Sequence, residues 1–249
     1  MSQHRFDKNL VSLTAPASFA AEQYQGLRLT VERFGRSRNA KVIAVTSPGA
    51  GEGKTLTAIN LSAALARGSE ANVLLIDADL RRPAVARQLG LADAGTRGLL
   101  ADADTRGLTD IIADANLTIE QVARPIEPYR LSVVPAGTVH TSVHQVLRSP
   151  RLDQILQAAR QRYDFIVIDT PPLLPVFDSA LLSRVVDGVL VVVAANHTPR
   201  KLLGEALNLL DASKVLGIVF NRDARPLFGY YDAYYREYFP DTSGIASEA

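Results

Sequence analysis

A glycine-rich turn between a short apolar strand and a helix is the feature that most constrains the fold of this chain. Residues 41–46 read KVIAVT, the next seven read SPGAGEG, and a helical pattern begins at Lys54. In this geometry the backbone N–H groups of Gly51, Gly53 and Lys54 can converge on a polyphosphate, because glycine allows close approach and a helix N-terminus favours negative charge. We therefore predict a phosphate-binding loop, with Lys54 on the β- and γ-phosphates and the Thr55 hydroxyl on magnesium.

The turn departs at one position from the strict P-loop pattern. That pattern, G-x-x-x-x-G-K-[ST], places a glycine six residues before the lysine, where this chain has Pro48. Taken alone, the stretch also fits an ordinary strand-to-helix turn with a lysine on the surface. In the P-loop interpretation the nucleotide contacts come from eight consecutive residues: Gly49, Ala50, Gly51, Glu52, Gly53, Lys54, Thr55 and Leu56.

Two later apolar runs of four residues each end in a carboxylate. Residues 73–76 precede Asp77, with Asp79 two positions further on, and residues 165–168 precede Asp169. Uninterrupted apolar runs are typical of buried parallel strands, and the carboxyl ends of such strands gather the ligands of an open α/β sheet. We therefore expect the lysine and hydroxyl of the loop and these three carboxylates to share one crevice.

These residue types suit phosphoryl transfer, which needs phosphate donors, magnesium and a carboxylate near the acceptor. Asp169 fits a Walker B role, holding magnesium directly or through water, with Thr55 as the hydroxyl ligand. Asp77 and Asp79 alternate in direction if the strand continues, so that one faces the metal and the other the incoming nucleophile. The sequence leaves open which of the two is the base. Each carboxylate also has a plainer interpretation, as a helix cap or a solvated loop residue.

Composition bounds the remaining possibilities. With 249 residues and 47% hydrophobic content, the chain can bury one large α/β core. The net charge is +1 with scattered Lys and Arg, which predicts no nucleic-acid partner. There is no cysteine, which excludes disulfides and thiolate metal sites. The longest apolar run, Val189 to Ala195, is far below the roughly 20 residues that span a bilayer, and the N-terminus lacks an apolar signal segment, so we expect a cytoplasmic protein.

The order of elements predicts alternating strands and helices. We expect an extended N-terminal arm over residues 1–17, an α/β domain over residues 18–222, and a flexible tyrosine-rich tail over residues 223–249. Ser18 is the expected N-cap of a first helix, and Ser149-Pro150 that of a later one. The predicted strands are 41–46, 72–77, 165–169, 188–194 and 215–221, with a strand that ends in a loop over 131–137. The predicted helices are 18–34, 54–67, 178–186 and 200–210, with another that starts at Pro150.

Together these motifs resemble the bacterial tyrosine kinases, the autokinases of exopolysaccharide and capsule synthesis. The resemblance rests on the P-loop at 47–55, the acidic strand end LIDADLRRP at 75–83, the phrase IDTPP at 168–172 and the terminal tyrosine cluster. It runs from about Leu13 to Arg222. The family fold is a P-loop NTPase fold related to ParA and MinD, with a mostly parallel central sheet flanked by helices on both faces.

The resemblance implies a role for each site residue. Lys54 and Thr55 correspond to the Walker A pair, Asp77 and Asp79 to the A′ carboxylates, and Asp169 to the Walker B aspartate. The implied catalytic set is therefore Lys54, Asp77, Asp79 and Asp169, and the implied magnesium ligands are Thr55, Asp77 and Asp169. Asn221 and Arg222 match the family stretch that contacts adenine. The implied cofactors are ATP and Mg2+, and the implied autophosphorylation sites are Tyr230, Tyr231, Tyr234, Tyr235 and Tyr238.

The resemblance also implies partners. The family's N-terminal helix carries E-x-x-R-x-x-R for subunit contact, and here Glu22 and Arg28 match whereas Gln25 replaces the first arginine. We expect a homo-oligomer whose ring assembly Gln25 weakens. The activator that some members carry in front of the kinase is missing from this sequence, so it resembles the split type. That type implies a separate transmembrane activator of the polysaccharide co-polymerase type, a cognate tyrosine phosphatase and a position at the inner face of the cell membrane.

Three alternatives remain beside the kinase hypothesis. A ParA/MinD-like ATPase switch would usually carry a signature lysine where this chain has Gly49. An inactive scaffolding relative is disfavoured by the full set of carboxylates. The tail could also form an amphipathic membrane helix, with Tyr231, Tyr234, Tyr235 and Tyr238 on one face, but a single arginine beside two acidic residues is a poor composition for one.

Overall fold

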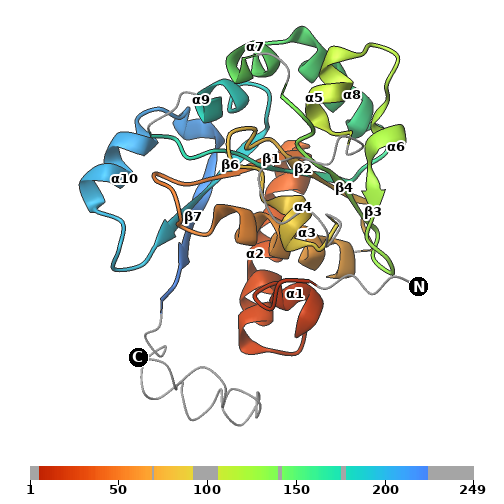
Figure 1. The fold of residues 1–249 in the computed structure, drawn as a ribbon. Helices are drawn as coiled ribbons and strands as arrows, with labels where there is room; N and C mark the ends of the chain where they lie inside the picture. Colours follow the sequence, from red (N-terminus) through yellow and green to blue (C-terminus); the bar gives the residue numbers. More distant parts are fainter. Residues whose placement is uncertain (1–5, 69, 92–105, 140–141, 175–177, 224–249) are drawn as a thin grey trace.

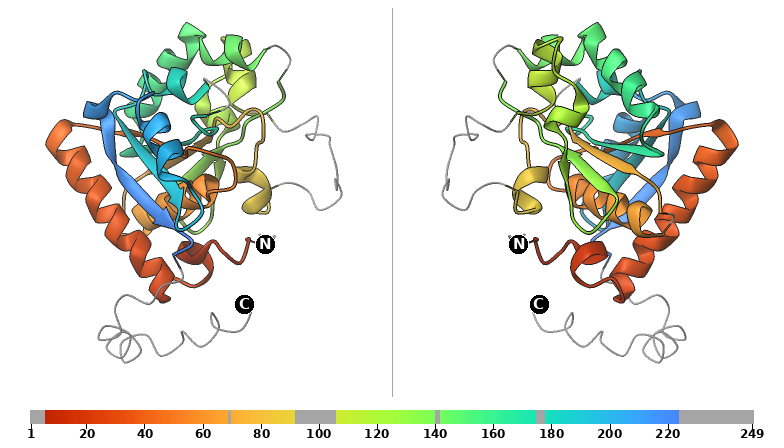
Figure 2. Two further views of the ribbon diagram at one scale, coloured as in Figure 1. Left: turned by 90° about the vertical axis from the view of Figure 1, so that its left-hand side faces the viewer. Right: turned by 90° about the vertical axis from the view of Figure 1, so that its right-hand side faces the viewer.

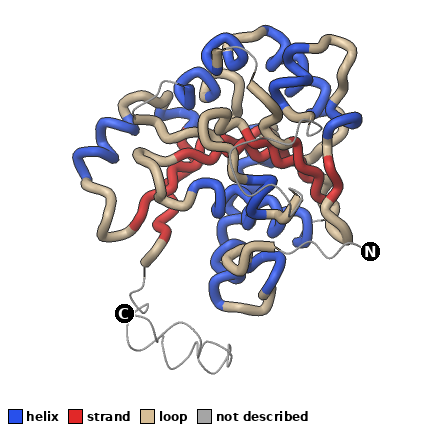
Figure 3. Tube along the Cα trace, in the orientation of Figure 1, coloured by secondary structure: helices blue, strands red, loops and turns tan. Residues whose placement is uncertain are grey.

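Seven strands in the order β3-β4-β2-β5-β1-β6-β7 form a sheet with helices on both faces (Figures 1 and 3). The structure, a computed structural model, describes residues 6–68, 70–91, 106–139, 142–174 and 178–223. All strand pairs are parallel except β3 with β4. The strands are β1 Val42–Thr46, β2 Val73–Asp77, β3 Arg124–Pro125, β4 Leu131–Val134, β5 Phe165–Asp169, β6 Gly188–Ala194 and β7 Val215–Asn221.

The helices divide between the two faces of the sheet. Residues of α1 to α4 join one apolar cluster, and residues of α5 to α10 join or pack against the other. Figure 2 shows the long helix α2 at one side of the sheet, beside β7. The helices are α1 Val11–Thr14, α2 Phe19–Arg38, α3 Lys54–Gly68, α4 Val85–Gln88, α5 Leu108–Ala113, α6 Ile119–Val122, α7 Val143–Leu147, α8 Pro150–Arg160, α9 Asp178–Leu182 and α10 Arg200–Leu207, with a 3₁₀ turn at Ala212–Lys214.

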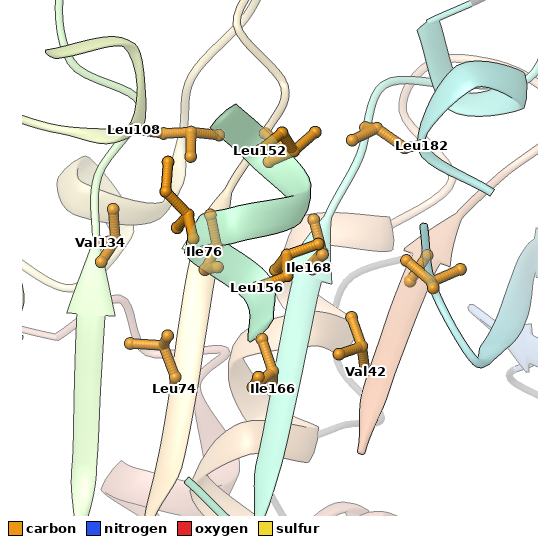
Figure 4. Close-up of a cluster of buried hydrophobic side chains, with 14 of the residues drawn as sticks. Val42, Leu74, Ile76, Leu108, Val134, Leu152, Leu156, Ile166, Ile168 and Leu182 are labelled. Carbon is orange, nitrogen blue, oxygen red and sulfur yellow. The ribbon is translucent and has the colours of Figure 1, made fainter. Parts of the chain in front are cut away.

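The strands are apolar throughout because both faces are covered. In β2, Leu74 faces the cluster that contains α8, whereas Leu75 faces the cluster that contains α3, and both are fully buried. Figure 4 shows Leu156 of α8 beside Ile76 of β2 and Ile168 of β5, in the cluster that also contains Leu74. Burying one such leucine stabilises the fold by about 1.5–3 kcal/mol. The apolar runs in the sequence are uninterrupted because successive residues of each strand face the two cores in turn.

The parallel register brings the predicted site residues to one edge of the sheet. Asp77 at the end of β2 lies opposite Asp169 at the end of β5, and Val45 of β1 also pairs with Asp169. The chain leaves β1 directly into the glycine-rich turn, which leads to α3. Three adjacent strands thus deliver the P-loop and the carboxylates to the same place, as the sequence predicts.

Two helix starts are confirmed in detail. The Ser18 side chain accepts a hydrogen bond from the backbone N–H of Ala21, and Ser149 accepts one from that of Arg151, with Pro150 in the first turn. The first helix runs four residues beyond its predicted end and stops at Asn39, which adopts a left-handed conformation (φ 51°) that ends the helix.

The prediction of an extended N-terminal arm is wrong for residues 11–14. Residues 11–14 form the short helix α1, and Leu10 and Leu13 are buried against the α3 side of the sheet. The Asn60 side chain of α3 accepts a hydrogen bond from the backbone N–H of Ser12 at 2.9 Å and donates one to the carbonyl of Asn9 at 3.1 Å. A segment this short has no period to read, so its burial was not visible in the sequence. The antiparallel edge strand β3 was missed for the same reason.

Candidate active site

The P-loop follows β1 and contains two glycines with positive φ. Gly51 has φ 78° and Gly53 has φ 95°, a region that side chains with a Cβ rarely adopt. A Cβ at Gly53 would also collide with the side-chain amide of Asn221. The sequence therefore needs glycine at both positions, and the turn predicted from their spacing is present.

Glu52 and Asn221 hold the loop in shape from its two sides. The Glu52 Oε1 accepts a hydrogen bond from the backbone N–H of Gly49 at 3.0 Å, and Asn221 Nδ2 donates to the Glu52 carbonyl at 2.9 Å. Glu52 is buried, and burial raises the pKa of its carboxyl above the usual value. Glu52 and Asn221 thus support the loop through their own hydrogen bonds. Adenine contacts by Asn221 and Arg222 stay a prediction.

Lys54, at the first position of α3, lies among the predicted acidic residues. Its Nζ lies 2.7 Å from Oδ2 of Asp79, 3.6 Å from Oδ1 of Asp169 and 3.3 Å from Oγ1 of Thr55. Burial acts to lower the pKa of Lys54, but the charges of Asp169 and Asp79 outweigh it and raise the pKa. Lys54 is therefore a buried cation at neutral pH.

Asp169 and Thr55 form the part of the site that fits a magnesium ion. The Thr55 hydroxyl donates to Oδ2 of Asp169 at 2.7 Å, and the other oxygen, Oδ1, is buried without a hydrogen-bond partner. Burial raises the pKa of Asp169 to about 7. A buried carboxylate oxygen without a hydrogen bond, 3.6 Å from the Lys54 ammonium and close to a hydroxyl, matches the oxygen ligands of Mg2+. This ion usually takes one or two carboxylates and completes its shell with water and phosphate. Within the described residues no group of three or more acidic or histidine side chains is placed to hold a metal by itself.

Asp77 and Asp79 have different surroundings. Both oxygens of Asp77 accept backbone hydrogen bonds, Oδ2 from Ala84 and Val85 at 3.0 and 3.1 Å and Oδ1 from Asp79 at 3.2 Å. Burial raises the pKa of Asp77 to about 6. Asp79 instead directs one oxygen at Lys54 and accepts a hydrogen bond from the backbone of Arg82 at 3.1 Å with the other. In this structure Asp77 shapes the loop after β2, and Asp79 faces the P-loop lysine.

The remaining predicted residues lie elsewhere. On α2, Arg28 pairs with Glu32 at 2.7 Å and with the Gln25 side chain at 2.8 Å, both within its own helix. The role of Glu22 and Arg28 in subunit contact therefore stays a prediction. The tail tyrosines lie outside the described residues: Tyr230, Tyr231, Tyr234, Tyr235 and Tyr238.

The sequence analysis missed one ion pair at the rim of the site. Arg81 follows Asp79 by two residues, and its Nε lies 2.6 Å from Oδ2 of Asp178, the first residue of α9. The pair joins positions that are 97 residues apart in the sequence. The only signal in the sequence was that Arg81 lies close to Asp79 and Asp178 lies close to Asp169.

Comparison with known proteins identifies the family of this chain. Residues 40–213 match the family model described as an AAA domain. A tyrosine-protein kinase of Bacillus subtilis, YwqD, is 31% identical over 232 residues, which cover 91% of this chain and 92% of that protein. The succinoglycan biosynthesis transport protein ExoP of Rhizobium meliloti is 29% identical, and the match covers 89% of this chain but 27% of ExoP.

Solved structures agree with the sequence matches. The VpsO kinase domain is 30% identical, with a TM-score of 0.66 over 86% of this chain and 94% of that one. The cell division ATPase MinD of Pyrococcus furiosus is 24% identical, with a TM-score of 0.56 over 75% of this chain and 74% of that one, a likeness of fold alone. Because the P-loop, the A′ and Walker B carboxylates and these matches coincide, the chain belongs to the bacterial tyrosine-kinase family of P-loop ATPases.

Proposed function

We propose that this protein is an ATP-dependent tyrosine autokinase that phosphorylates its C-terminal tyrosine cluster, with one subunit presenting its tail to the active site of another. The observation that carries the proposal is the meeting of Lys54, Thr55, Asp79 and Asp169 within hydrogen-bonding or ion-pairing distance at the start of α3. Family membership supports the choice of tyrosine as the acceptor.

The residues of the site divide the work of phosphoryl transfer. Lys54 neutralises charge on the β- and γ-phosphates, and the P-loop N–H groups before it orient them. Thr55 and Asp169 would hold Mg2+, which would supply charge neutralisation on the phosphate oxygens. Asp79 is the better placed of the two A′ carboxylates to accept the tyrosine proton, because its Oδ2 is held only by Lys54, which would turn to the phosphates when ATP binds, whereas both oxygens of Asp77 are held by backbone N–H groups.

The product would change the charge of the tail. Each phosphotyrosine adds about −1.5 to −2 charge. After the transfer, several phosphotyrosines on one tail would repel the carboxylates of the site. We therefore propose that phosphorylation releases the tail and loosens the oligomer.

The setting of the reaction is part of the proposal. We propose a cytoplasmic protein held at the inner face of the cell membrane by a separate transmembrane activator of the polysaccharide co-polymerase type, reset by a cognate tyrosine phosphatase. ExoP is named for succinoglycan biosynthesis and transport, and this chain spans about a quarter of its length. That relation supports a role in regulating exopolysaccharide or capsule synthesis and export. The proposed chemistry depends on Lys54 and uses ATP and Mg2+.

A mixing experiment tests transfer between subunits. A Lys54→Met chain with an intact tail is incubated with ATP, magnesium and an active chain that lacks residues 229–249. Transfer between subunits requires phosphotyrosine on the Lys54→Met chain. An unlabelled Lys54→Met chain, alongside normal labelling of full-length active protein, would show that each subunit phosphorylates only itself.

An ATPase switch without kinase activity is the second candidate. It shares the P-loop ATPase fold with the kinase, but Gly49 stands where such a switch would usually carry its signature lysine. ATP hydrolysis without phosphotyrosine on the wild-type chain would support this candidate over the kinase.

A further inference from the structure

The ion pair between Arg81 and Asp178 joins the loop that contains Asp79 to the first residue of α9, in the segment that follows Asp169. The Arg81 Nε lies 2.6 Å from Oδ2 of Asp178, and Nη2 lies 3.4 Å from Oδ1. The Asp178 side chain is 3% exposed, whereas that of Arg81 is 47% exposed. A carboxylate this buried needs a partner, because an unpaired buried charge is strongly unfavourable.

On one side, the pair is anchored to the loop that follows β2. Arg81 lies two residues after Asp79, and the backbone N–H of Arg82 donates to Oδ1 of Asp79 at 3.1 Å. Further along, Ala84 and Val85 donate to Asp77. The loop is thus wrapped around the two A′ carboxylates, and a movement of Arg81 would be transmitted to Asp79.

On the other side, the pair reaches a segment that is bonded to the P-loop. After Asp169, the backbone N–H of Leu173 donates to the Ser47 carbonyl at 2.8 Å, and that of Leu174 donates to the Pro48 carbonyl at 3.2 Å. The Ser179 hydroxyl, next to Asp178, donates to the Pro171 carbonyl. Asp178 is therefore fixed relative to the loop that presents Lys54.

We infer that Arg81 and Asp178 are positioning residues that hold Asp79 opposite Lys54 and Asp169. The backbone N–H of Ala78 also donates to the Asp169 carbonyl at 2.8 Å. This bond fixes the end of β2 against β5 but does not fix the loop beyond β2. The predicted effect of the Arg81–Asp178 pair on the phosphorylation rate rests on the proposed kinase function. Its predicted effect on the contact between Lys54 and Asp79 does not.

The competing explanation is that Asp178 only stabilises the first turn of α9. Acidic residues in a first helical turn do so generally. In that case Arg81 would be dispensable, and a change at Asp178 would lower thermal stability without a particular effect on Asp79. The two explanations differ in whether the two residues act as a unit.

Five variants separate them: Arg81→Gln, Arg81→Lys, Asp178→Asn, the double variant of Arg81→Gln with Asp178→Asn, and Arg82→Gln as the matched control. Arg82 is the next residue and is exposed, and its side chain makes no hydrogen bond or ion pair with the described residues. Steady-state phosphorylation gives kcat and the KM for ATP. Because a misplacement of about 1 Å can cost about 100-fold in rate, we expect kcat to fall by about 10- to 100-fold in both single variants and no further in the double variant. We expect the KM for ATP to change by less than about 2-fold, and Arg81→Lys to recover part of the rate.

A second readout does not require kinase activity. The Lys54 amine of nucleotide-free protein is labelled with an amine-reactive reagent and quantified by peptide mass spectrometry. If the pair holds Asp79 on Lys54, labelling of Lys54 rises in Arg81→Gln and Asp178→Asn but not in Arg82→Gln. Unchanged labelling in folded Arg81→Gln, or losses that add in the double variant, would overturn the inference. If the wild-type chain has no kinase activity but the variants show this labelling pattern, the proposed function is refuted and the positioning role stands.

Discussion

The ammonium nitrogen of Lys54 lies 2.7 Å from Oδ2 of Asp79, so the P-loop lysine and a carboxylate beyond β2 form a largely buried ion pair. Both side chains are about nine-tenths shielded from water, which makes the pair stronger than a surface one. In the proposed function the β- and γ-phosphates of ATP bind the same ammonium group. We therefore expect ATP and Asp79 to compete for Lys54.

This competition predicts opposite effects of Asp79→Asn on binding and on chemistry. Without the carboxylate charge, Lys54 is free to meet phosphate, and we expect the affinity for ATP to stay equal or to rise by up to about tenfold, which is about 1.4 kcal/mol. Tyrosine phosphorylation should fall, because the residue that faces the acceptor has lost its charge. Titration with a fluorescent ATP analogue and an anti-phosphotyrosine blot measure the two. Loss of ATP binding in the folded variant would contradict the competition.

Asp77→Asn should instead act on stability. Asp77 accepts three backbone hydrogen bonds from the loop after β2, and an asparagine can accept with only one of its two groups. Hydrogen bonds to a charged group are worth about 1.5–3 kcal/mol each. We expect a loss of about 2 kcal/mol in the free energy of unfolding, measured by urea denaturation. Asp153→Asn, at an exposed carboxylate of α8, is the control and should cost less. Equal stabilities of the two variants would show that Asp77 does not hold the loop.

The pair between Arg160 and Asp187 predicts a pH-dependent contribution to stability. Arg160 donates to both oxygens of Asp187 at 2.7 Å, and the backbone N–H groups of Lys41 and Val42 donate to Oδ2 at 2.8 Å. Burial acts to raise the pKa of Asp187, but the hydrogen bonds from Arg160 and the backbone outweigh it, so the pKa lies below its usual value of 3.8. A depressed acid pKa stabilises the fold above pH 3.8, and this stabilisation is lost as the pH falls through the folded-state pKa.

Asp187→Asn should therefore lower the free energy of unfolding at pH 7 by about 1–3 kcal/mol. The difference from wild type should shrink as the pH falls below about 4. Urea denaturation at a series of pH values measures it. A difference that stays constant down to pH 3 would rule out the charge of Asp187 as the cause.

The exposed face of α2 predicts weak, concentration-dependent assembly. Glu22 is exposed near the start of the helix, whereas Arg28 is mostly buried and pairs with Glu32 in its own helix. Gln25→Arg would restore the first arginine of the contact motif and supply a charge-assisted pair, about twice as strong as a neutral hydrogen bond. We expect Gln25→Arg to raise the molar mass seen by light scattering at a given concentration and Glu22→Ala to lower it. Arg36→Ala, at an arginine whose side chain is 78% exposed on the same helix, is the control. Identical dilution curves for all four proteins would exclude this helix as the contact.

The site was predictable from the sequence because its parts lie at the ends of strands. Apolar runs locate the buried strands, and a parallel sheet brings the carboxyl ends of neighbouring strands together. Lys54, Thr55, Asp79 and Asp169 could therefore be grouped without coordinates. The division of labour between Asp77 and Asp79 could not, because it depends on which backbone N–H groups the loop after β2 turns inward.

Two further features were beyond the sequence for a different reason. The Arg81–Asp178 pair depends on where α9 begins relative to a loop nearly a hundred residues earlier, and no periodic pattern records such a distance. The burial of Leu10 and Leu13 depends on α3 presenting Asn60 to a short segment that has no pattern of its own. Local signals predict elements, whereas these contacts arise only once the elements are packed.

Intact-mass measurement after incubation with ATP and magnesium tests the central claim most directly. The wild-type chain should gain several increments of one phosphate group, mapped by peptide analysis to Tyr230, Tyr231, Tyr234, Tyr235 or Tyr238. Lys54→Met should gain none, because the charge that neutralises the β- and γ-phosphates is lost, whereas Lys201→Met, at an exposed lysine on α10, should behave as wild type. An unmodified wild-type mass, or equal phosphorylation of Lys54→Met, would contradict the assignment of this site as a tyrosine autokinase.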